Sequence, residues 1–131
     1  MKKGFILLEI LLGITFLGIV AAASLPLMTN SMISMDRAAE RGEMIYLCDY
    51  VAQKLKTDDD EVLESVESLL NEGSIEYRDE EIDEDVYSCT LDLMEAEGNY
   101  MLIGVRIKSQ KYDNMEVRLE VSRQIQGVFT N

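Results

Sequence analysis

The amino-terminal part of the chain is almost entirely apolar. Residues 5–25 contain a single charged side chain, Glu9. About 20 apolar residues in a helix are enough to cross a bilayer, so this stretch predicts a transmembrane helix over residues 5–25. Lys2 and Lys3 precede it, and positive residues favour keeping that end in the cytoplasm. We therefore expect a single-pass protein whose carboxyl-terminal part lies outside the cytoplasm.

Helical spacing resumes after Pro26. Because proline lacks a backbone N–H, we expect a kink or an interruption there. An amphipathic half of the helix is predicted over residues 26–57, with an apolar stripe that must pack against something. We interpret its methionines as core filling rather than as a groove for a partner. The stripe consists of Met28, Met32, Met35, Met44, Cys48, Val51 and Leu55, with Ile45 and Leu47 beside it.

The pattern changes twice beyond residue 57. Acidic residues 58–60 suit the start of a helix, and Gly73 suits its end. After Gly73 the apolar period becomes two, which predicts strands around residues 87–93, 101–107 and 115–121. Turns are predicted at 95–99 and 112–114, and a short additional strand at 74–78. The helix between Asp60 and Gly73 would bury Val62, Leu63, Val66, Leu69 and Leu70.

These patterns together predict an α+β fold. A long amino-terminal helix, with a transmembrane half and an amphipathic half, would pack on a small antiparallel β-sheet with one apolar face. The predicted divisions are residues 1–4, 5–25, 26–57 and a globular domain over 58–131.

Glu9 is the anomaly in the apolar stretch. A carboxylate inside a spanning helix costs about 2.5–3.5 kcal/mol on insertion scales, so such a residue usually has a function and a partner. Cleavage after Gly4 would create a positive amine on Phe5, one helical turn from Glu9. Glu9 of one subunit could equally pair with the Phe5 amine of another, which would also fix their register.

The segment from Lys3 to Glu9 resembles the prepilin-peptidase site of type IV pilins and type II secretion pseudopilins. That family has a short basic leader ending in Gly, then Phe, three apolar residues and Glu. Gly18 and Pro26 also fall where the family's helix is weakened. The resemblance covers residues 1 to about 30, and here Ile6 replaces the commoner Thr.

The resemblance implies a pilin-like fold and a role for each matching residue. Residues 1–4 would be a leader removed after Gly4, Phe5 would become the N-methylated terminus, and Glu9 would direct assembly. Gly18 and Pro26 would break the helix. Implied partners are a prepilin peptidase, other pilin or pseudopilin subunits, and an assembly platform in the inner or cytoplasmic membrane. The subunit would then move into a cell-surface or periplasmic fibre.

The machine stays open: a type IV pilus, a type II secretion system or a competence pseudopilus for DNA uptake. Small size favours a minor subunit, and Glu9 argues against a tip subunit. An alternative is an ordinary secretory signal cleaved after residues 21–23, which would release an acidic binding domain beginning at Ser24. An uncleaved membrane anchor is a further alternative.

Charge argues against one class of partner. The net charge of -13 is concentrated in residues 58–97, where 17 acidic residues and one basic residue give -16. Residues 98–131 have five basic and three acidic residues, or +2. Binding to a nucleic-acid duplex depends on Lys and Arg neutralising phosphates, so we expect no direct nucleic-acid binding. A solvated acidic face is the simpler interpretation.

Candidate chemistry is sparse. With no His, Ser-His and Cys-His nucleophiles and an ordinary zinc site are excluded, and we expect neither enzyme activity nor a cofactor. Paired carboxylates of a glycosidase are allowed by composition alone. Outside the cytoplasm Cys48 and Cys89 could form a disulfide, or both could be small buried side chains. Asp79, Asp83 and Asp85 could hold calcium, although an exposed acidic loop without EF-hand spacing is the simpler interpretation.

Overall fold

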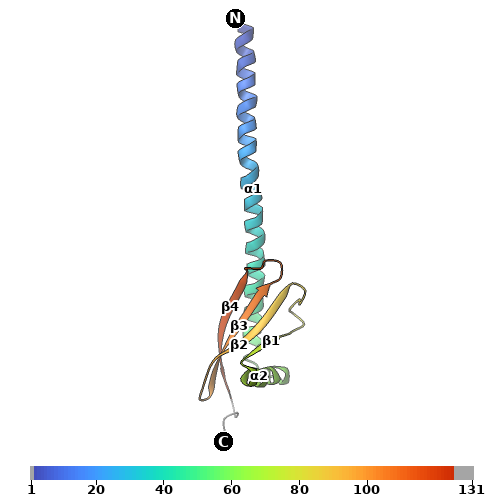
Figure 1. The fold of residues 1–131 in the computed structure, drawn as a ribbon, viewed down its shortest axis with the longest axis vertical. Helices are drawn as coiled ribbons and strands as arrows, with labels where there is room; N and C mark the ends of the chain where they lie inside the picture. The colour runs from blue at the N-terminus through green and yellow to red at the C-terminus, as the bar shows by residue number, and fades with distance from the viewer. Residues whose placement is uncertain (1, 126–131) are drawn as a thin grey trace. The chain divides into compact units, whose positions relative to one another are not determined.

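The computed structural model describes residues 2–125. The chain forms two compact units, Met1–Ala39 and Glu40–Asn131, which we call the amino-terminal and carboxyl-terminal units. Helix α1 runs over Lys2–Lys54 and contributes to both. The other elements belong to the carboxyl-terminal unit (Figure 1): α2 (Asp60–Glu72), β1 (Ser74–Tyr77), β2 (Tyr87–Glu97), β3 (Tyr100–Ser109) and β4 (Glu116–Gln124).

The four strands form one antiparallel sheet in the order β1-β2-β3-β4. Gly98 has φ of 59° in the tight turn between β2 and β3, and Gly73 has φ of 78° where α2 ends. Both values lie in the left-handed region that glycine adopts without a steric penalty. The Gly73 N–H donates to the Leu69 carbonyl, so the end of α2 is capped and β1 starts at once.

One face of the sheet and one side of α2 enclose the second part of α1. Met44 and Val51 of α1, and Leu55 directly after its end, are completely buried. Alternate strand residues point at them because side chains of a strand alternate between the two faces. The inward-facing core residues of the sheet are Tyr77, Tyr87, Cys89, Leu91, Met101, Ile103, Val105, Ile107 and Val121.

Arg123 connects β4 to the end of α1. Its guanidinium is buried and donates to the carbonyl oxygens of Leu55 and Thr57, and it pairs with Asp58 at 3.1 Å. Leu55 and Thr57 lie in the turn directly after α1, and a basic group near the carboxyl end of a helix complements the helix dipole. The contact therefore joins this turn to a strand residue far away in sequence.

The predicted α+β class is confirmed: a long apolar amino-terminal helix and a four-stranded antiparallel sheet against its second part, as in a pilin. The helix ending at Gly73 and the short strand after it are also present. The turn predicted at 95–99 is shorter, because β2 continues to Glu97 through a bulge between Leu93 and Glu95. The compact carboxyl-terminal unit begins at Glu40, not at the predicted boundary at 58, because α1 supplies part of its core.

The methionine prediction was wrong for three residues. Met28, Met32 and Met35 are 65%, 71% and 72% exposed, whereas Met44 is fully buried. The sheet begins to cover α1 only at Glu40, so an apolar stripe upstream has no protein surface against it. Ile45, at 52% exposed, is also outside the core.

The predicted break at Gly18 and Pro26 is also absent, since α1 continues through both. Proline removes a single N–H from the hydrogen-bond ladder while the turns on either side keep theirs. Thr29 donates to the carbonyl of Leu25, beside the proline, at 3.0 Å. Gly18 retains its own N–H, so it weakens the helix without interrupting it.

Met44→Ala and Met35→Ala form a matched pair that tests this division of α1. Truncating the buried Met44 should lower the free energy of unfolding by about 2–5 kcal/mol, because it leaves a cavity in the core. Truncating the exposed Met35 should lower the free energy of unfolding by less than about 0.5 kcal/mol. Chemical denaturation of the detergent-solubilised chain measures both, and equal losses would contradict the described core.

Candidate functional site

The amino-terminal unit is a helix without a protein cover. Every residue from 2 to 39 is exposed, including Phe5 at 71% and Leu17 at 71%. Among residues 2–125, α1 is the one helix long and apolar enough to cross a membrane. Apolar surface on this scale is unfavourable in water, so a bilayer or other protein has to cover it.

The three residues of the predicted processing and assembly site lie in the first turns of α1. Phe5 and Glu9 are four residues apart and therefore lie on the same face of the helix, one turn from each other. Both are exposed. A Cβ added at Gly4 would meet nothing within 4 Å, so packing in this chain does not explain the glycine.

Other polar groups in this part of α1 are satisfied within the helix. The hydroxyls of Thr15 and Ser24 donate to the carbonyls four residues earlier, at 2.8 and 2.7 Å. In hydrocarbon such bonds are needed, because no water is present to replace them. Glu9 differs: within residues 2–125 it makes no hydrogen bond or ion pair. In hydrocarbon its carboxylate would therefore need a partner from outside the described residues.

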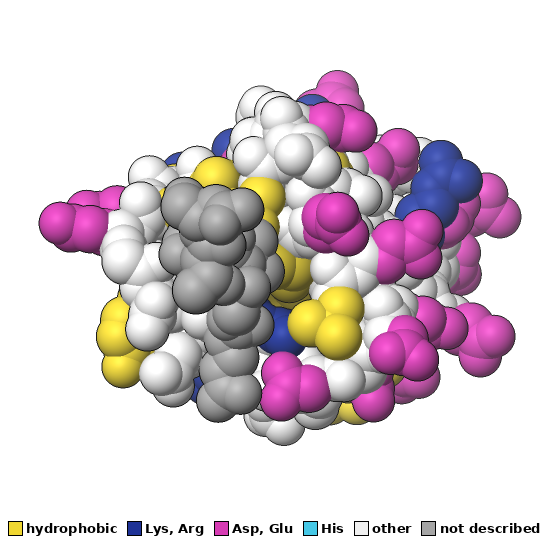
Figure 2. All heavy atoms as spheres, turned by 90° about the horizontal axis from the view of Figure 1, so that it is seen from below, with side chains coloured by type: hydrophobic (Ala, Val, Ile, Leu, Met, Phe, Trp, Pro, Cys, Tyr) yellow, Lys and Arg dark blue, Asp and Glu magenta, His cyan; other side chains and the backbone are white. Residues whose placement is uncertain are grey.

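The carboxyl-terminal unit contains an acidic groove of about 1110 Å³ between the end of α1, α2, β1 and the loop after β1. Lys54 and Arg78 are the cations among its lining residues, and each already pairs with carboxylates. Figure 2 shows acidic side chains projecting around this end of the unit. The groove therefore repels anionic partners. Its acidic residues are Glu61, Glu64, Glu72, Glu76, Asp79, Glu80, Glu81 and Glu84.

Asp79 is the buried anchor of this groove. Its carboxylate accepts hydrogen bonds from Lys54 Nζ at 2.5 Å, from the hydroxyls of Tyr50 and Tyr77 at 3.3 Å each, and from the Glu81 amide at 3.1 Å. These bonds attach the loop after β1 to α1. Sequence reasoning missed this role, although Tyr50 and Lys54 are spaced to share one helix face.

The same contacts shift pKa values around Asp79. Burial by itself would raise the pKa of Asp79, but the Lys54 ammonium and the Glu81 amide outweigh burial and lower it. The hydrogen bond to Asp79 raises the pKa of Lys54. Burial is the largest cause that raises the pKa of Tyr77 to about 12. At neutral pH the cluster is thus a charged Lys–Asp pair flanked by two neutral phenols.

The calcium site considered for Asp79, Asp83 and Asp85 is not formed. Asp79 is already occupied by Lys54, and an Asp83 oxygen accepts from the Asp85 amide at 3.0 Å. In the described part of the chain no three acidic or cysteine side chains gather as ligands for a metal ion. The hydrogen bonds of Asp79 and Asp83 are thus made to α1 and within the acidic loop.

The disulfide considered between Cys48 and Cys89 is also not formed; both thiols are free and buried. Cys48 Sγ lies 3.7 Å from the Val117 carbonyl oxygen on β4, and Cys89 lies on β2 opposite Ile107 of β3. Burial raises the pKa of Cys48 to about 11 and that of Cys89 to about 12. Neither is a reactive thiolate at neutral pH, and both act as small core residues.

Asp79→Asn should destabilise the carboxyl-terminal unit by about 1–3 kcal/mol at pH 7, because Lys54 loses its carboxylate in a largely buried site. The folded pKa of Asp79 is depressed, so its contribution is present above the unfolded value of about 3.9 and is lost as the pH falls through the folded pKa. The difference in melting temperature between the two chains should therefore shrink in acid.

Thermal unfolding of both chains at a series of pH values measures this effect. Glu80→Gln removes an equal charge from an exposed neighbour and is the matched control. A difference that persists unchanged at low pH would mean that the carboxylate charge of Asp79 is not responsible.

The described residues thus offer two features: the uncovered α1 with Phe5 and Glu9 on one face, and an acidic unit whose buried charges are internally paired. The first places Phe5 and Glu9 on one helix face, while the calcium site and the disulfide considered from the sequence are not formed in the described residues. Comparison with protein-family models, with curated proteins and with solved structures finds no match to this chain.

Proposed function

We propose that this chain is a minor pilin or pseudopilin subunit that assembles into a fibre through α1. One observation carries the proposal: residues 5–25 form a fully exposed, apolar part of α1 with a single carboxylate, Glu9, which lies one turn from Phe5, and Phe5 directly follows a Lys-Lys-Gly leader. The fold, with a four-stranded sheet on the second part of the helix, agrees with this class of protein.

The leader would be removed by a prepilin peptidase acting between Gly4 and Phe5. Hydrolysis of that peptide bond gives the Gly4 carboxylate and a free amine on Phe5. Because Phe5 lies at the start of α1, its ammonium group would add to the positive end of the helix dipole. An anionic group near this end is favoured, and Glu9 of a neighbouring subunit would supply it.

Before processing, the helix would lie in the cytoplasmic membrane with Lys2 and Lys3 on the cytoplasmic side. The carboxyl-terminal unit would then be outside the cytoplasm. An unpaired Glu9 is costly in lipid, while a Glu9–ammonium pair between subunits is stronger there than in water. The same pair therefore favours extraction into a fibre and fixes the axial position of each new subunit.

The machine would be a type IV pilus, a type II secretion system or a competence pseudopilus. Its other components would be further subunits of this class and a membrane assembly platform. The acidic carboxyl-terminal unit argues against direct contact with nucleic acid in any of them. We assign the protein no enzymatic role and no cofactor.

Amino-terminal sequencing of the mature protein tests the processing step. We expect the chain to begin at Phe5, with a mass increase for one methyl group on the amine. A chain that begins at Ser24 would instead identify ordinary signal peptidase and a released acidic domain. A chain that still begins at Met1 would identify an uncleaved anchor, and Gly4→Leu serves as the control that should block processing at Phe5.

Glu9→Ala tests the assembly step. Processing and membrane insertion should be unchanged, while incorporation into fibres should fall by about tenfold or more, since each ~1.4 kcal/mol of lost pairing energy changes an equilibrium constant tenfold. Immunoblotting of sheared fibres against membranes measures incorporation. Glu67→Ala makes the same chemical change on exposed α2 and should assemble normally; normal assembly of Glu9→Ala would remove the pairing role.

A further inference from the structure

Strand β1 lies at one edge of the sheet, because the strand order is β1-β2-β3-β4. In an antiparallel pair, alternate residues hydrogen-bond to the neighbouring strand, and the residues between them direct their backbone groups away from it. Leu93 of β2 donates to the Gly73 carbonyl at 2.8 Å, which sets this alternation for β1. The backbone N–H and C=O groups of Ser74 and Glu76 therefore point away from β2. We call these groups the open edge of β1.

The open edge has no partner within residues 2–125. No hydrogen bond is made there to the backbone N–H or C=O of Ser74 or Glu76 on the side away from β2. Both residues are exposed. An unpaired strand edge is a template on which an extended segment adds as a further strand, held by main-chain hydrogen bonds. The open edge therefore indicates a peptide ligand.

The acidic groove runs along this edge. All four residues of β1 line it, together with residues of α2, of the loop after β1 and of the end of α1. In Figure 1 β1 lies at the edge of the sheet, directly above α2. The groove volume of about 1110 Å³ exceeds the ~300–1,000 Å³ of ordinary small-molecule pockets, and its lining is mostly polar where such pockets are mostly apolar. A polar chain segment fits this space better than a small apolar molecule.

Charge selects a cationic segment. Eight carboxylates and two cations line the groove, which gives a formal charge of -6, and both cations already pair with carboxylates. A segment paired with β1 would place alternate side chains on the two faces of the sheet. On one face they would lie beside the exposed Glu76, and on the other beside Ile75, which is half-buried and packs against the core. Alternating basic and apolar residues suit both neighbours.

Strand β4, at the other edge, lacks this combination. Its residues Glu116, Arg118 and Glu120 alternate in charge, so they do not select one sign of partner. The hollow beside its last residues has a volume of about 190 Å³, much smaller than the acidic groove. At β1, by contrast, residues of α2 and of the loop line the groove on either side of the strand. A single extended segment enters such a groove more easily than the sheet edge of a folded neighbour does.

We propose that the carboxyl-terminal unit binds an extended basic segment of another protein, which adds to the open edge of β1 as a further antiparallel strand. Its backbone would bond to Ser74 and Glu76, and every second side chain, a Lys or Arg, would reach the groove carboxylates. The proposal concerns the carboxyl-terminal unit alone. It does not depend on the role proposed for α1.

A blocked hexapeptide of alternating lysine and valine tests this with the full chain in a neutral detergent. Fluorescence anisotropy of the labelled peptide measures the Kd. In the antiparallel pairing the lysine residues direct their backbone toward β1, so N-methylation of the lysine amides should raise the Kd about fivefold or more. N-methylation of the valine amides should change it by less than about twofold. A peptide with glutamate in place of lysine should not bind.

Matched variants locate the contact on the protein. Glu64→Gln and Glu72→Gln each remove one groove carboxylate and should raise the Kd about two- to threefold. Glu67→Gln makes the same change on α2 outside the groove lining and should leave the Kd unchanged. Hydrogen exchange followed by nuclear magnetic resonance should slow about tenfold at the Glu76 amide when the peptide is bound. Exchange at the Arg118 amide on β4 should stay the same.

Equal effects of the two methylated peptides, or of the groove and control variants, would mean non-specific charge attraction and would overturn the proposal. Slower exchange at Arg118 in place of Glu76 would place the peptide on β4 and overturn it as well. Protection of the Glu76 amide that appears without peptide and rises with protein concentration would identify a second copy of the chain as the occupant instead. Amino-terminal processing and fibre assembly are measured separately, so failure here leaves the proposed function untouched, and the reverse also holds.

Discussion

The uncovered apolar surface of α1 is the constraint on which the rest depends. Residues 2–39 have no protein surface of their own chain against them, and the first part of this helix is as apolar as a membrane span. Water solvates such a surface poorly, so lipid or other protein has to replace water around it. In hydrocarbon the Glu9 carboxylate would also require a positively charged partner.

The carboxyl-terminal unit is built to hold the other part of the same helix. Met44, Val51 and Leu55 complete its core, Arg123 binds the turn directly after α1, and Asp79 holds Lys54. These contacts come from strands and loops far apart in sequence, so the helix cannot leave the sheet without losing core packing and two buried charge contacts. The carboxyl-terminal unit therefore holds the second part of α1, while residues 2–39 of the same helix stay exposed.

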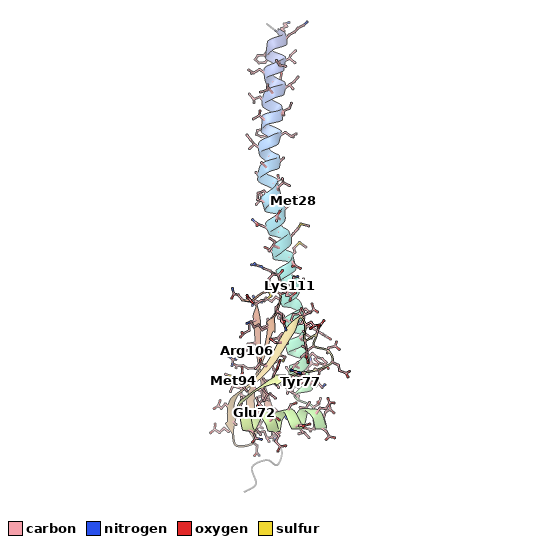
Figure 3. The ribbon with its side chains drawn as sticks, turned by 45° about the vertical axis from the view of Figure 1, so that its right-hand side comes forward. Met28, Glu72, Tyr77, Met94, Arg106 and Lys111 are labelled. Atoms are coloured by element: carbon pink, nitrogen blue, oxygen red, sulfur yellow. The ribbon has the colours of Figure 1, made fainter. Side chains whose placement is uncertain are left out.

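The surface of the carboxyl-terminal unit is acidic, but in the described residues no three acidic or cysteine side chains gather as ligands for a metal ion. The basic groups of the groove are already paired, and Asp83 closes its own loop. On the outer face of the sheet, Arg106 pairs with Asp92 and approaches Glu116 at 3.6 Å (Figure 3). What remains is a net negative field, which repels like-charged units.

The sequence by itself determined the elements. A period of two predicted the strands, acidic residues and Gly73 bounded α2, and the apolar run with Glu9 predicted the helix that carries the proposed function. These features are local, since they depend on residues a few positions apart. Tertiary structure alone decided that Met44 is buried and Met28 exposed, that Asp79 pairs with Lys54, and that both thiols are buried. The reason is that an apolar stripe in the sequence does not show where along the helix the sheet ends. A cluster of acidic residues likewise does not show which charged side chain lies closest to each of them once the chain has folded.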